Sequence, residues 1–289
     1  MIDLKGIGFG DQKTRNPLQK GLNWIGHLVS FLNHKDKKDI FLLTRKTIKL
    51  CKLAGFSVSF DVFKQILSLH LIIKHMSTPM INKKRLIFLV IGDGYGFMAS
   101  LIKECFPNAL VILVDLGKVL LFQTYYLQKI YSKYAHVLFD DISTNNITEC
   151  DFLYCPADKL NNLSKGLHGQ KLKIDTSINI ASMQEMTLES IQKYFDFLRE
   201  NSSKENLFYC CNREKKTLIG GEVLEIRKYP WCDLDHIYID EYCPWYRFFF
   251  TVYPFLGKNK PQLMGVSIPF VNYFDGPFIH RLAKLETSF

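Results

Sequence analysis

Three glycines and one aspartate are the residues of this chain best suited to holding a ligand. The segment LIFLVIGDGYGFMASLI, residues 86–102, is an apolar run that breaks into Gly92, Gly94 and Gly96 and then continues with helical spacing. In a strand–turn–helix of this kind, the first glycine allows the sharp turn, the second lets a ligand approach the backbone, and the third lets strand and helix pack closely. Asp115 ends the next apolar run, ALVILVD, where a carboxylate can accept hydrogen bonds from both hydroxyls of a ribose. The pattern predicts a ligand that contains a nucleoside.

The spacing of the glycines distinguishes between classes of nucleotide. A dinucleotide fingerprint, G-x-G-x-x-G, would place a glycine where Phe97 stands, and the Gly-Lys-Ser/Thr of a phosphate-binding loop does not occur. The G-x-G-x-G form is common in methyltransferases that use S-adenosylmethionine, although NAD enzymes also place an acid like Asp115. A further acid, Asp158, follows a third apolar run, FLYCP, at a position that often contacts the adenine amine in this class. We therefore expect S-adenosylmethionine as the cofactor.

The segments that would position these residues alternate between strand-like and helix-like patterns from residue 85 onward. Strands are predicted over residues 86–91, 109–114, 151–155, 174–181 and 206–211, and helices over residues 96–105, 118–133 and 186–200. Alternation of this kind is typical of an α/β protein with a mostly parallel sheet and helices on both faces. Ser182-x-x-Glu185 has the form of a capping box for the last helix. The expected architecture is a Rossmann-like methyltransferase fold.

The two ends of the chain differ from this central region. Residues 18–76 show helical spacing, with one apolar face formed by Leu22, Ile25, Val29 and Leu32 and another by Phe63, Ile66, Leu67 and Leu71. We expect an N-terminal helical cap of two to four helices within residues 1–84 and a methyltransferase domain over residues 85–289. After residue 213, the turn Gly220-Gly221 and an aromatic-rich segment predict a C-terminal antiparallel extension of the sheet.

Composition and charge bound the classes of protein that fit. The chain has 289 residues, 47% of them hydrophobic, which suits a sizeable core, and no apolar segment reaches the roughly 20 residues of a transmembrane span. Its eight cysteines form no C-x-x-C, which favours a reducing, cytoplasmic location. Residues 1–85 carry 16 basic and 5 acidic side chains, a net charge of +11, whereas the remainder carries −2. This basic third is either a solvated helical face or a surface that attracts a phosphate-bearing acceptor or a membrane, and it matches no nucleic-acid motif.

The central sequence resembles the sugar O-methyltransferase family over residues 85–230. The resemblance rests on the glycine turn with Tyr95, on Asp115-Leu116, on the block Asn-x-x-Ser-Met-Gln-Glu-Met that begins at Asn179, on Tyr194-Phe195, and on Asn212-Arg213. It implies methyl transfer from S-adenosylmethionine to a sugar hydroxyl, as in polysaccharide biosynthesis, and it adds Leu116 and Asn179 to the cofactor-binding residues. One position departs from the family. Val90 stands where an acid is usual, and Asp93, between the glycines, could instead hold the amino end of methionine.

The implied reaction needs a base near the glycine turn. The acceptor oxygen, the methyl group and the sulfur must be aligned, and the hydroxyl proton must be removed. Glu185 is the first candidate, because it follows the strand 174–181 at the carboxyl edge of the sheet, where such sites lie. Ser182 and Gln184 are candidates for binding the acceptor. Asn179, like Ser182, could orient the acceptor. The alternative for Glu185 is its role in the capping box, and for Asn179 and Ser182 it is ordinary polarity at a strand end or a helix cap.

A second region, WCDLDHIYIDEYCPWY at residues 231–246, combines acids with aromatic rings, as sugar sites often do. His236 is a second candidate base, and Asp240, Glu241 and Tyr242 are candidates for acceptor binding. Asp235, Asp240 and Glu241 are the acids that could hold a divalent metal ion, but their spacing matches no known metal loop, and no metal site is predicted. The alternative is a solvated acidic loop.

Three functional hypotheses follow. The first is methylation of a sugar hydroxyl on a polysaccharide, glycolipid or nucleotide-sugar acceptor. The second keeps the reaction and replaces the sugar by a small metabolite, a lipid or a peptide. The third is a catalytically inactive, nucleotide-binding scaffold that docks partners through its basic helices, which Val90 favours.

Overall fold

The computed structural model describes residues 17–55, 58–139, 147–247, 250–251, 262–263, 265–267, 272–273 and 277–287. Contacts divide the chain into two compact units, which we call the helical unit (residues 1–71 and 242–278) and the sheet unit (residues 72–241 and 279–289). The sequence-based division into residues 1–84 and 85–289 assigns the segment 242–278 differently, and as a division into folding domains it stays a prediction. The first sixteen residues, which form part of the basic third, lie outside the described residues.

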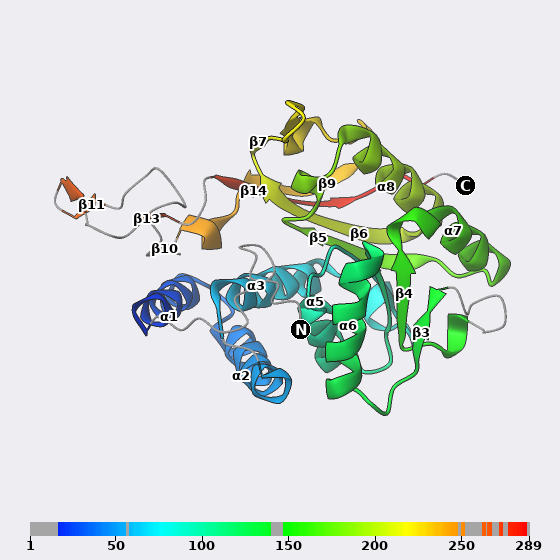
Figure 1. Cartoon of the computed structure of the whole chain (residues 1–289), viewed down its shortest axis with the longest axis horizontal. Coiled ribbons are helices and arrows are strands. Elements are labelled where there is room, and N and C mark those ends of the chain that lie inside the picture. The colour runs from blue at the N-terminus through cyan, green and yellow to red at the C-terminus, as the bar shows by residue number, and fades with distance from the viewer. Residues whose placement is uncertain are drawn as a thin grey trace. The chain divides into compact units, whose positions relative to one another are not determined.

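The helical unit contains three long helices (Figure 1). They are α1 (Pro17–Leu32), α2 (Lys37–Ala54) and α3 (Phe60–His75), the last of which continues into the sheet unit. Further along the chain come the 3-10 helix η6 (Pro244–Arg247) and two antiparallel pairs, β10 (Phe250–Thr251) with β13 (Asn272–Tyr273) and β11 (Gln262–Leu263) with β12 (Val266–Ser267). α3 buries the predicted face residues Phe63, Ile66 and Leu67, which agrees with the expected helical cap.

The buried face of α1 is polar, opposite to the sequence-based prediction. Ile25 and Leu32, which we expected in the core, are 53% and 56% exposed, whereas the buried residues of the helix are Gln19, Asn23, Gly26, His27 and Ser30. The His27 ring lies 3.0 Å from Oγ1 of Thr44 and stacks on Phe63 with a centroid separation of 4.0 Å. Burial lowers the pKa of His27 to about 4, so the ring is neutral near pH 7. A neutral, hydrogen-bonded imidazole is tolerated in a core, which explains how this face packs.

The sheet unit is built on an eight-stranded sheet with the order β3-β4-β2-β1-β5-β6-β14-β9. The strands are β1 (Ile87–Ile91), β2 (Leu110–Asp115), β3 (His136–Leu138), β4 (Phe152–Pro156), β5 (Ile174–Ile180), β6 (Ser202–Arg213), β9 (His236–Tyr242) and β14 (Phe278–Lys284). Neighbouring strands from β3 to β6 are parallel, and β14 and β9 form the antiparallel extension. The predicted Rossmann-like methyltransferase fold is confirmed.

Helices cover both faces of this sheet (Figure 1). They are α4 (Thr78–Ile81), α5 (Phe97–Cys105), α6 (Gly117–Ile130), α7 (Leu160–Gly169) and α8 (Leu188–Asn201), with the 3-10 helices η2 (Ile147–Glu149), η3 (Ala157–Lys159), η4 (Met183–Glu185) and η5 (Ile226–Lys228). Every residue of β1 is buried, as expected for a parallel strand covered on both sides. One face includes Leu89 in a core cluster with Leu163 of α7 and Phe195 of α8. The other face lies toward α5 and α6, because right-handed crossovers that move in opposite directions along the sheet place their helices on opposite faces.

The predicted strands and helices all occur, and β3 and α7 are among the elements that the sequence reading missed. β3 has only three residues, too few for an alternating pattern to be visible. α7, with the sequence LNNLSKGLHG, contains residues of low helix propensity and is held by the buried side chains of Leu160, Leu163 and Leu167. The predicted turn at Gly220-Gly221 joins the hairpin of β7 (Lys215–Thr217) and β8 (Val223–Glu225). Among the described residues, none of the helices has both the length and the apolar character to cross a bilayer.

Candidate functional site

The glycine turn joins β1 to α5, and its three glycines differ in what surrounds them. Gly92, Gly94 and Gly96 have φ values of 73°, 63° and 81°, a region that side chains disfavour. A Cβ atom built on Gly92 would lie 2.2 Å from Oγ of Ser182, and one on Gly96 would lie 2.9 Å from Cδ1 of Leu127. A Cβ on Gly94 would meet no atom of the described residues within 4 Å. The turn is therefore packed at its two ends and open at its middle glycine.

Asp93, between the first two glycines, holds the start of α5. Its carboxylate accepts hydrogen bonds from the backbone N–H groups of Met98 and Ala99 at 2.9 and 2.8 Å. Burial raises the pKa of Asp93 to about 7, and these two hydrogen bonds only partly oppose that rise. Val90, at the position where the family usually has an acid, is buried in β1. The structure thus shows Asp93 as a helix cap, and its contact with the cofactor stays a prediction.

Asp115 ends β2 beside the turn, and several donors already contact its carboxylate. Oδ1 accepts the N–H of Leu116 and Oδ2 accepts Nε2 of Gln123, both at 2.8 Å, and the backbone N–H of Gly94 also donates. Burial raises the pKa of Asp115 to about 6, against the lowering effect of these three hydrogen bonds. A carboxylate offers about four lone-pair sites, so roughly one remains for a ligand hydroxyl unless a donor moves.

Gln123 is a residue of this site that the sequence reading missed. Its side chain is fully buried, and its Oε1 has no hydrogen-bond partner among the described residues. It stands eight positions after Asp115, on the second turn of α6, so its face of the helix points back toward the strand end. That spacing was visible in the sequence and could have identified it.

Asp158 lies at the same edge of the sheet as Asp115. β4 runs parallel beside β2, with Pro156 in register with Asp115, and Asp158 follows two residues later in η3 with its side chain exposed. Leu116, which begins the loop into α6, is 68% exposed. Because parallel strands end at one edge, the glycine turn, Asp115 and Asp158 come from three neighbouring strands of that edge.

Amide side chains join the ends of β1, β5 and β6. Nδ2 of the fully buried Asn179 donates to the carbonyl of Ile91 at 3.0 Å and to Oγ of Ser182, and its Oδ1 accepts Nδ2 of Asn212 at 2.8 Å. Oδ1 of Asn212 in turn accepts the backbone N–H of Gln184 at 3.1 Å. The structure therefore brings the predicted residues Asn179, Ser182 and Gln184 to the edge of the glycine turn. Their polar groups bond to the protein itself, which is the structural alternative stated above.

The capping box predicted from Ser182 and Glu185 is wrong. α8 begins at Leu188, and its N-cap is Thr187, whose Oγ1 accepts the N–H of Ser190 at 3.3 Å. The strand β5 instead leads through Ala181, which has a φ of 59°, into the separate short helix η4. Ser182 and Glu185 have the spacing of a capping box, but they lie at the two ends of η4, and the chain turns between η4 and the start of α8.

Glu185 lies at the end of η4, just past the carboxyl end of β5. Its side chain is 57% exposed and forms an ion pair with Lys216 of β7. Its position at the edge that carries the glycine turn agrees with the expectation, and its carboxylate is open to solvent. The assignment of Glu185 as the catalytic base stays a prediction.

The second candidate region forms β9, at the far edge of the sheet. Four strand spacings of about 4.8 Å separate β9 from β1, a lateral distance of roughly 19 Å. His236 is exposed at the start of β9, with its ring 4.6 Å from that of Tyr238, and Tyr242 at the end is 39% exposed. The structure does not bring His236 or Tyr242 beside the glycine turn.

The acids of this region are engaged with cationic side chains. Asp240 lies 2.6 Å from Arg281, whose hydrogen bond and charge outweigh the effect of burial and keep the pKa of Asp240 below its usual range. Glu241 lies 3.4 Å from Nε2 of His280, and Asp235 lies 2.7 Å from Arg199. Among the described residues, Asp235, Asp240 and Glu241 do not gather into a group that could share one metal ion.

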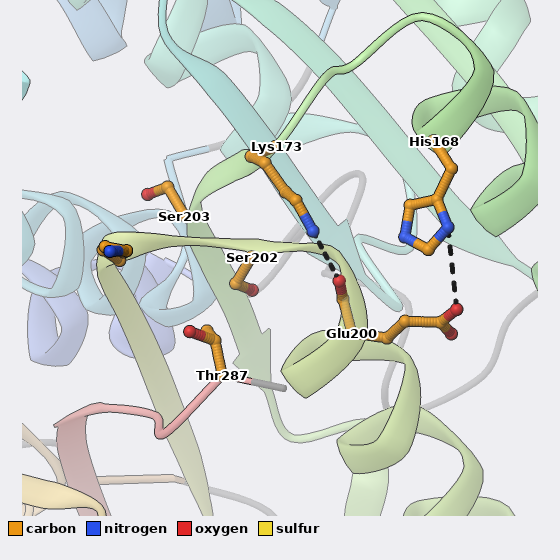
Figure 2. Close-up of a pocket in the computed structure, with 7 residues that line it drawn as sticks. His168, Lys173, Glu200, Ser202, Ser203 and Thr287 are labelled. Atoms are coloured by element: carbon orange, nitrogen blue, oxygen red, sulfur yellow. Dashed lines mark hydrogen bonds and ion pairs between the residues drawn. The ribbon is translucent and has the colours of Figure 1, made fainter. Parts of the chain in front are cut away.

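A cavity of about 630 Å³ lies at the opposite edge of the sheet, at the amino ends of β5 and β6 (Figure 2). It is lined by His168, Lys173, Glu200, Ser202, Ser203, Lys204 and Thr287. Figure 2 shows the ammonium of Lys173 bonded to the carbonyl of Glu200, at 2.7 Å, and His168 near the carboxylate of Glu200, at 3.7 Å. Ligands of open α/β sheets bind at the carboxyl ends of the strands, so we do not place the expected cofactor in this cavity.

The chain matches no protein-family model and no curated protein. Among solved structures, a proposed O-methyltransferase from Klebsiella pneumoniae aligns over 93% of this chain and 100% of its own, at 12% identity and a TM-score of 0.48. The precorrin-6y C5,15-methyltransferase of Geobacter metallireducens GS-15 aligns over 79% of this chain and 90% of its own, at 11% identity and a TM-score of 0.40. The cyclopropane synthase MmaA2 of Mycobacterium tuberculosis aligns over 51% of this chain and 42% of its own, at 13% identity and a TM-score of 0.35.

Proposed function

We propose that this protein transfers a methyl group from S-adenosylmethionine to a hydroxyl group of an acceptor. The observation that carries the proposal is the open middle of the glycine turn. The backbone of Gly94 faces free space, and Asp115 and Asp158 end the two neighbouring strands at the same edge. What distinguishes this open glycine is its place at the carboxyl ends of parallel strands, where ligands of open α/β sheets bind.

The residues at this edge fit an adenosine-containing cofactor. Asp115 would accept one ribose hydroxyl, or both if a present donor moves, and Asp158 would accept the adenine amine. The space beside Gly94 would admit the part of the cofactor that must approach the backbone. When bound, S-adenosylmethionine supplies a methyl group on a positively charged sulfur, a good leaving group. The chain then has to orient the acceptor hydroxyl and accept its proton. We assign that role to Glu185, and its exposed carboxylate beyond β5 supports the assignment.

The acceptor we propose is a sugar hydroxyl, on the strength of the family resemblance of residues 178–213. Asn179, Ser182 and Gln184 form hydrogen bonds that hold the strand ends together. Contacts with the acceptor would therefore come from exposed residues nearby, including Glu185. A small metabolite or a lipid as acceptor is equally compatible with this edge. We also propose that the protein is cytoplasmic and that its acceptor can carry a phosphate group.

Cofactor binding and acceptor use can be tested separately. Isothermal titration of the full chain with S-adenosylhomocysteine should show binding, and NAD should show none, whereas the reverse result would overturn the proposal. With labelled methyl donor, label should appear on sugar acceptors in a panel that also contains phenols, lipids and peptides. Label confined to a non-sugar acceptor would retain the methyl transfer and reject the sugar.

The role of Glu185 can be tested with a matched pair of variants. Glu185→Gln should lower kcat by about 100-fold or more, the usual contribution of a general base, with little change in cofactor affinity. Glu189→Gln is the control, because Glu189 is also an exposed glutamate in an ion pair, 2.7 Å from Lys193, but lies on α8. Equal activity of the two variants would remove Glu185 from the reaction. Retained cofactor binding with no transfer by the wild-type chain to any acceptor would favour the inactive scaffold.

A further inference from the structure

Two histidines and one aspartate of the helical unit lie close together, and none of them belongs to the proposed methyltransferase site. His34 follows α1, Asp36 is the N-cap residue of α2, and His70 lies on α3. One ligand atom from each lies within 4.8 Å of the other two. Oδ2 of Asp36 is 3.9 Å from Nδ1 of His34 and 4.0 Å from Nε2 of His70. Two segments, the turn between α1 and α2 and the helix α3, thus bring two imidazoles and a carboxylate together.

From this arrangement we propose that His34, Asp36 and His70 bind a divalent transition-metal ion, with Zn²⁺ as the best fit. Imidazole nitrogen and carboxylate oxygen are ligands that zinc prefers. Bonds of about 2.1 Å in a tetrahedral site place neighbouring ligand atoms about 3.4 Å apart. The observed separations of 3.9 and 4.0 Å therefore need to close by roughly half an ångström, which side-chain rotation can supply. Three protein ligands leave the fourth position for water.

The orientation of Asp36 supports a ligand role. Aspartate is among the residues that most often cap a helix N-terminus with their side chain, yet the carboxylate of Asp36 makes no such bond to α2. Its Oδ2 lies instead toward the two imidazoles. The backbone N–H of Asp36 donates to Nδ1 of His34 at 3.3 Å, so that nitrogen carries no proton, and a metal ion bound there would replace this hydrogen bond at the lone pair. An unprotonated ring nitrogen is the form that binds a metal.

The exposure of the three side chains suits a site that an ion can enter. The side chain of His70 is 4% exposed, whereas those of His34 and Asp36 are 24% and 28% exposed. The ion would therefore bind the buried imidazole of His70 on its inner side and His34 and Asp36 on its solvent side. Neighbouring lysines oppose a cation at long range (Lys35, Lys37 and Lys38), so the affinity must come from the three ligands themselves.

A metal ion at this point would connect the turn between α1 and α2 to the middle of α3. The same geometry also suits an ion pair of Asp36 with a protonated histidine, without metal. The two differ in a measurable way, because only a metal site makes the stability of the folded chain depend on zinc concentration.

The test is zinc titration of the full chain after treatment with chelator and reductant. One zinc per chain should bind, and at 100 times the dissociation constant it should raise the Tm by roughly 5 °C. His34→Gln and Asp36→Asn change partly exposed residues and should each weaken zinc binding about 100-fold or more. His75→Gln, on the same helix α3, is the matched control and should bind as the wild type does.

Three results would overturn the proposal. The first is the absence of saturable zinc binding to the wild-type chain. The second is zinc binding that His34→Gln and Asp36→Asn leave unchanged. The third is a cobalt-loaded sample with the near-ultraviolet absorption of thiolate ligation, which would point to the eight free cysteines. His70→Ala is not the primary variant, because removal of a buried side chain lowers stability whether or not metal binds.

Discussion

Substitution of the middle glycine by alanine separates ligand binding from packing in the glycine turn. In Gly94→Ala the new methyl group meets no atom of the described residues within 4 Å, so the protein itself bears only the cost of a left-handed alanine, about 1 kcal/mol. For a chain of this size that lowers the Tm by roughly 2–4 °C. The methyl group does occupy the space where we place the cofactor. Overpacking there by about 2 kcal/mol would weaken S-adenosylhomocysteine binding about 30-fold.

Gly92→Ala is the matched control for this substitution. Its φ is similar, but its methyl group would lie 2.2 Å from Oγ of Ser182, which is itself bonded to the carbonyl of Ile91. Because neither partner can move freely, we expect a loss of roughly 3 kcal/mol or more in the free energy of unfolding. The two variants should therefore show opposite profiles, one stable and deficient in binding, the other unstable.

Calorimetric titration with S-adenosylhomocysteine and urea unfolding of both variants provide the measurements. Wild-type affinity in Gly94→Ala would refute the placement of the cofactor beside the middle glycine. A loss of stability in Gly94→Ala as large as that in Gly92→Ala would refute the premise that this space is open.

Three further outcomes follow from the same edge of the sheet. The pKa of Asp93, about 7 in the folded chain against 3.8 as its ordinary value, means that its favourable contribution is complete below about pH 4 and is lost as the pH rises to about 7. Asp93→Asn should therefore destabilise the chain more at pH 5 than at pH 8 in urea unfolding, and an equal loss at both pH values would contradict this. Because the pKa of Asp115 is about 6, affinity for S-adenosylhomocysteine should fall below that pH. Gln123→Ala removes a hydrogen-bond donor to the carboxylate and should move the midpoint of this pH dependence to higher pH. A midpoint that does not move would exclude a role for Gln123. Thr187→Ala should cost about 1 kcal/mol, with Thr187→Ser retaining most of the stability, and equal losses would show that Thr187 does not cap α8.

The central strands of the sheet were predictable from the sequence because they are buried on both faces. The runs that became β1 and β2 are continuously apolar and are followed by turn residues, so both their type and their ends were visible. The positive φ values of the three glycines likewise follow from a turn that only glycine adopts easily. The inverted burial of α1 was not predictable, because it depends on partners such as Thr44 and Phe63 that lie on other helices.

For the candidate site, the sequence identified residue types and their positions on the sheet edge, but not their hydrogen bonds. Asn179 and Gln184 were chosen for their chemistry, and the structure gives their amides partners across three strands. Asp93 was read as a cofactor contact, and its oxygens are held by the start of α5. Such bonds depend on distances between segments far apart in the chain, which one sequence does not contain. The assignments of Glu185 and His236 stay predictions for the same reason.

The network around Asn179 also bears on how the edge of the sheet moves. The ends of β1, β5 and β6 are joined by several buried hydrogen bonds, and exposing each unpaired group would cost about 1–3 kcal/mol. This part of the edge should open only with global unfolding, so its amide protons should exchange slowly. After β2 and β4 the described bonds between segments centre on Asp115, and Leu116 and Asp158 are themselves exposed. Any motion that admits a ligand is therefore concentrated on that side, and hydrogen exchange should show one slow and one fast half of the same edge.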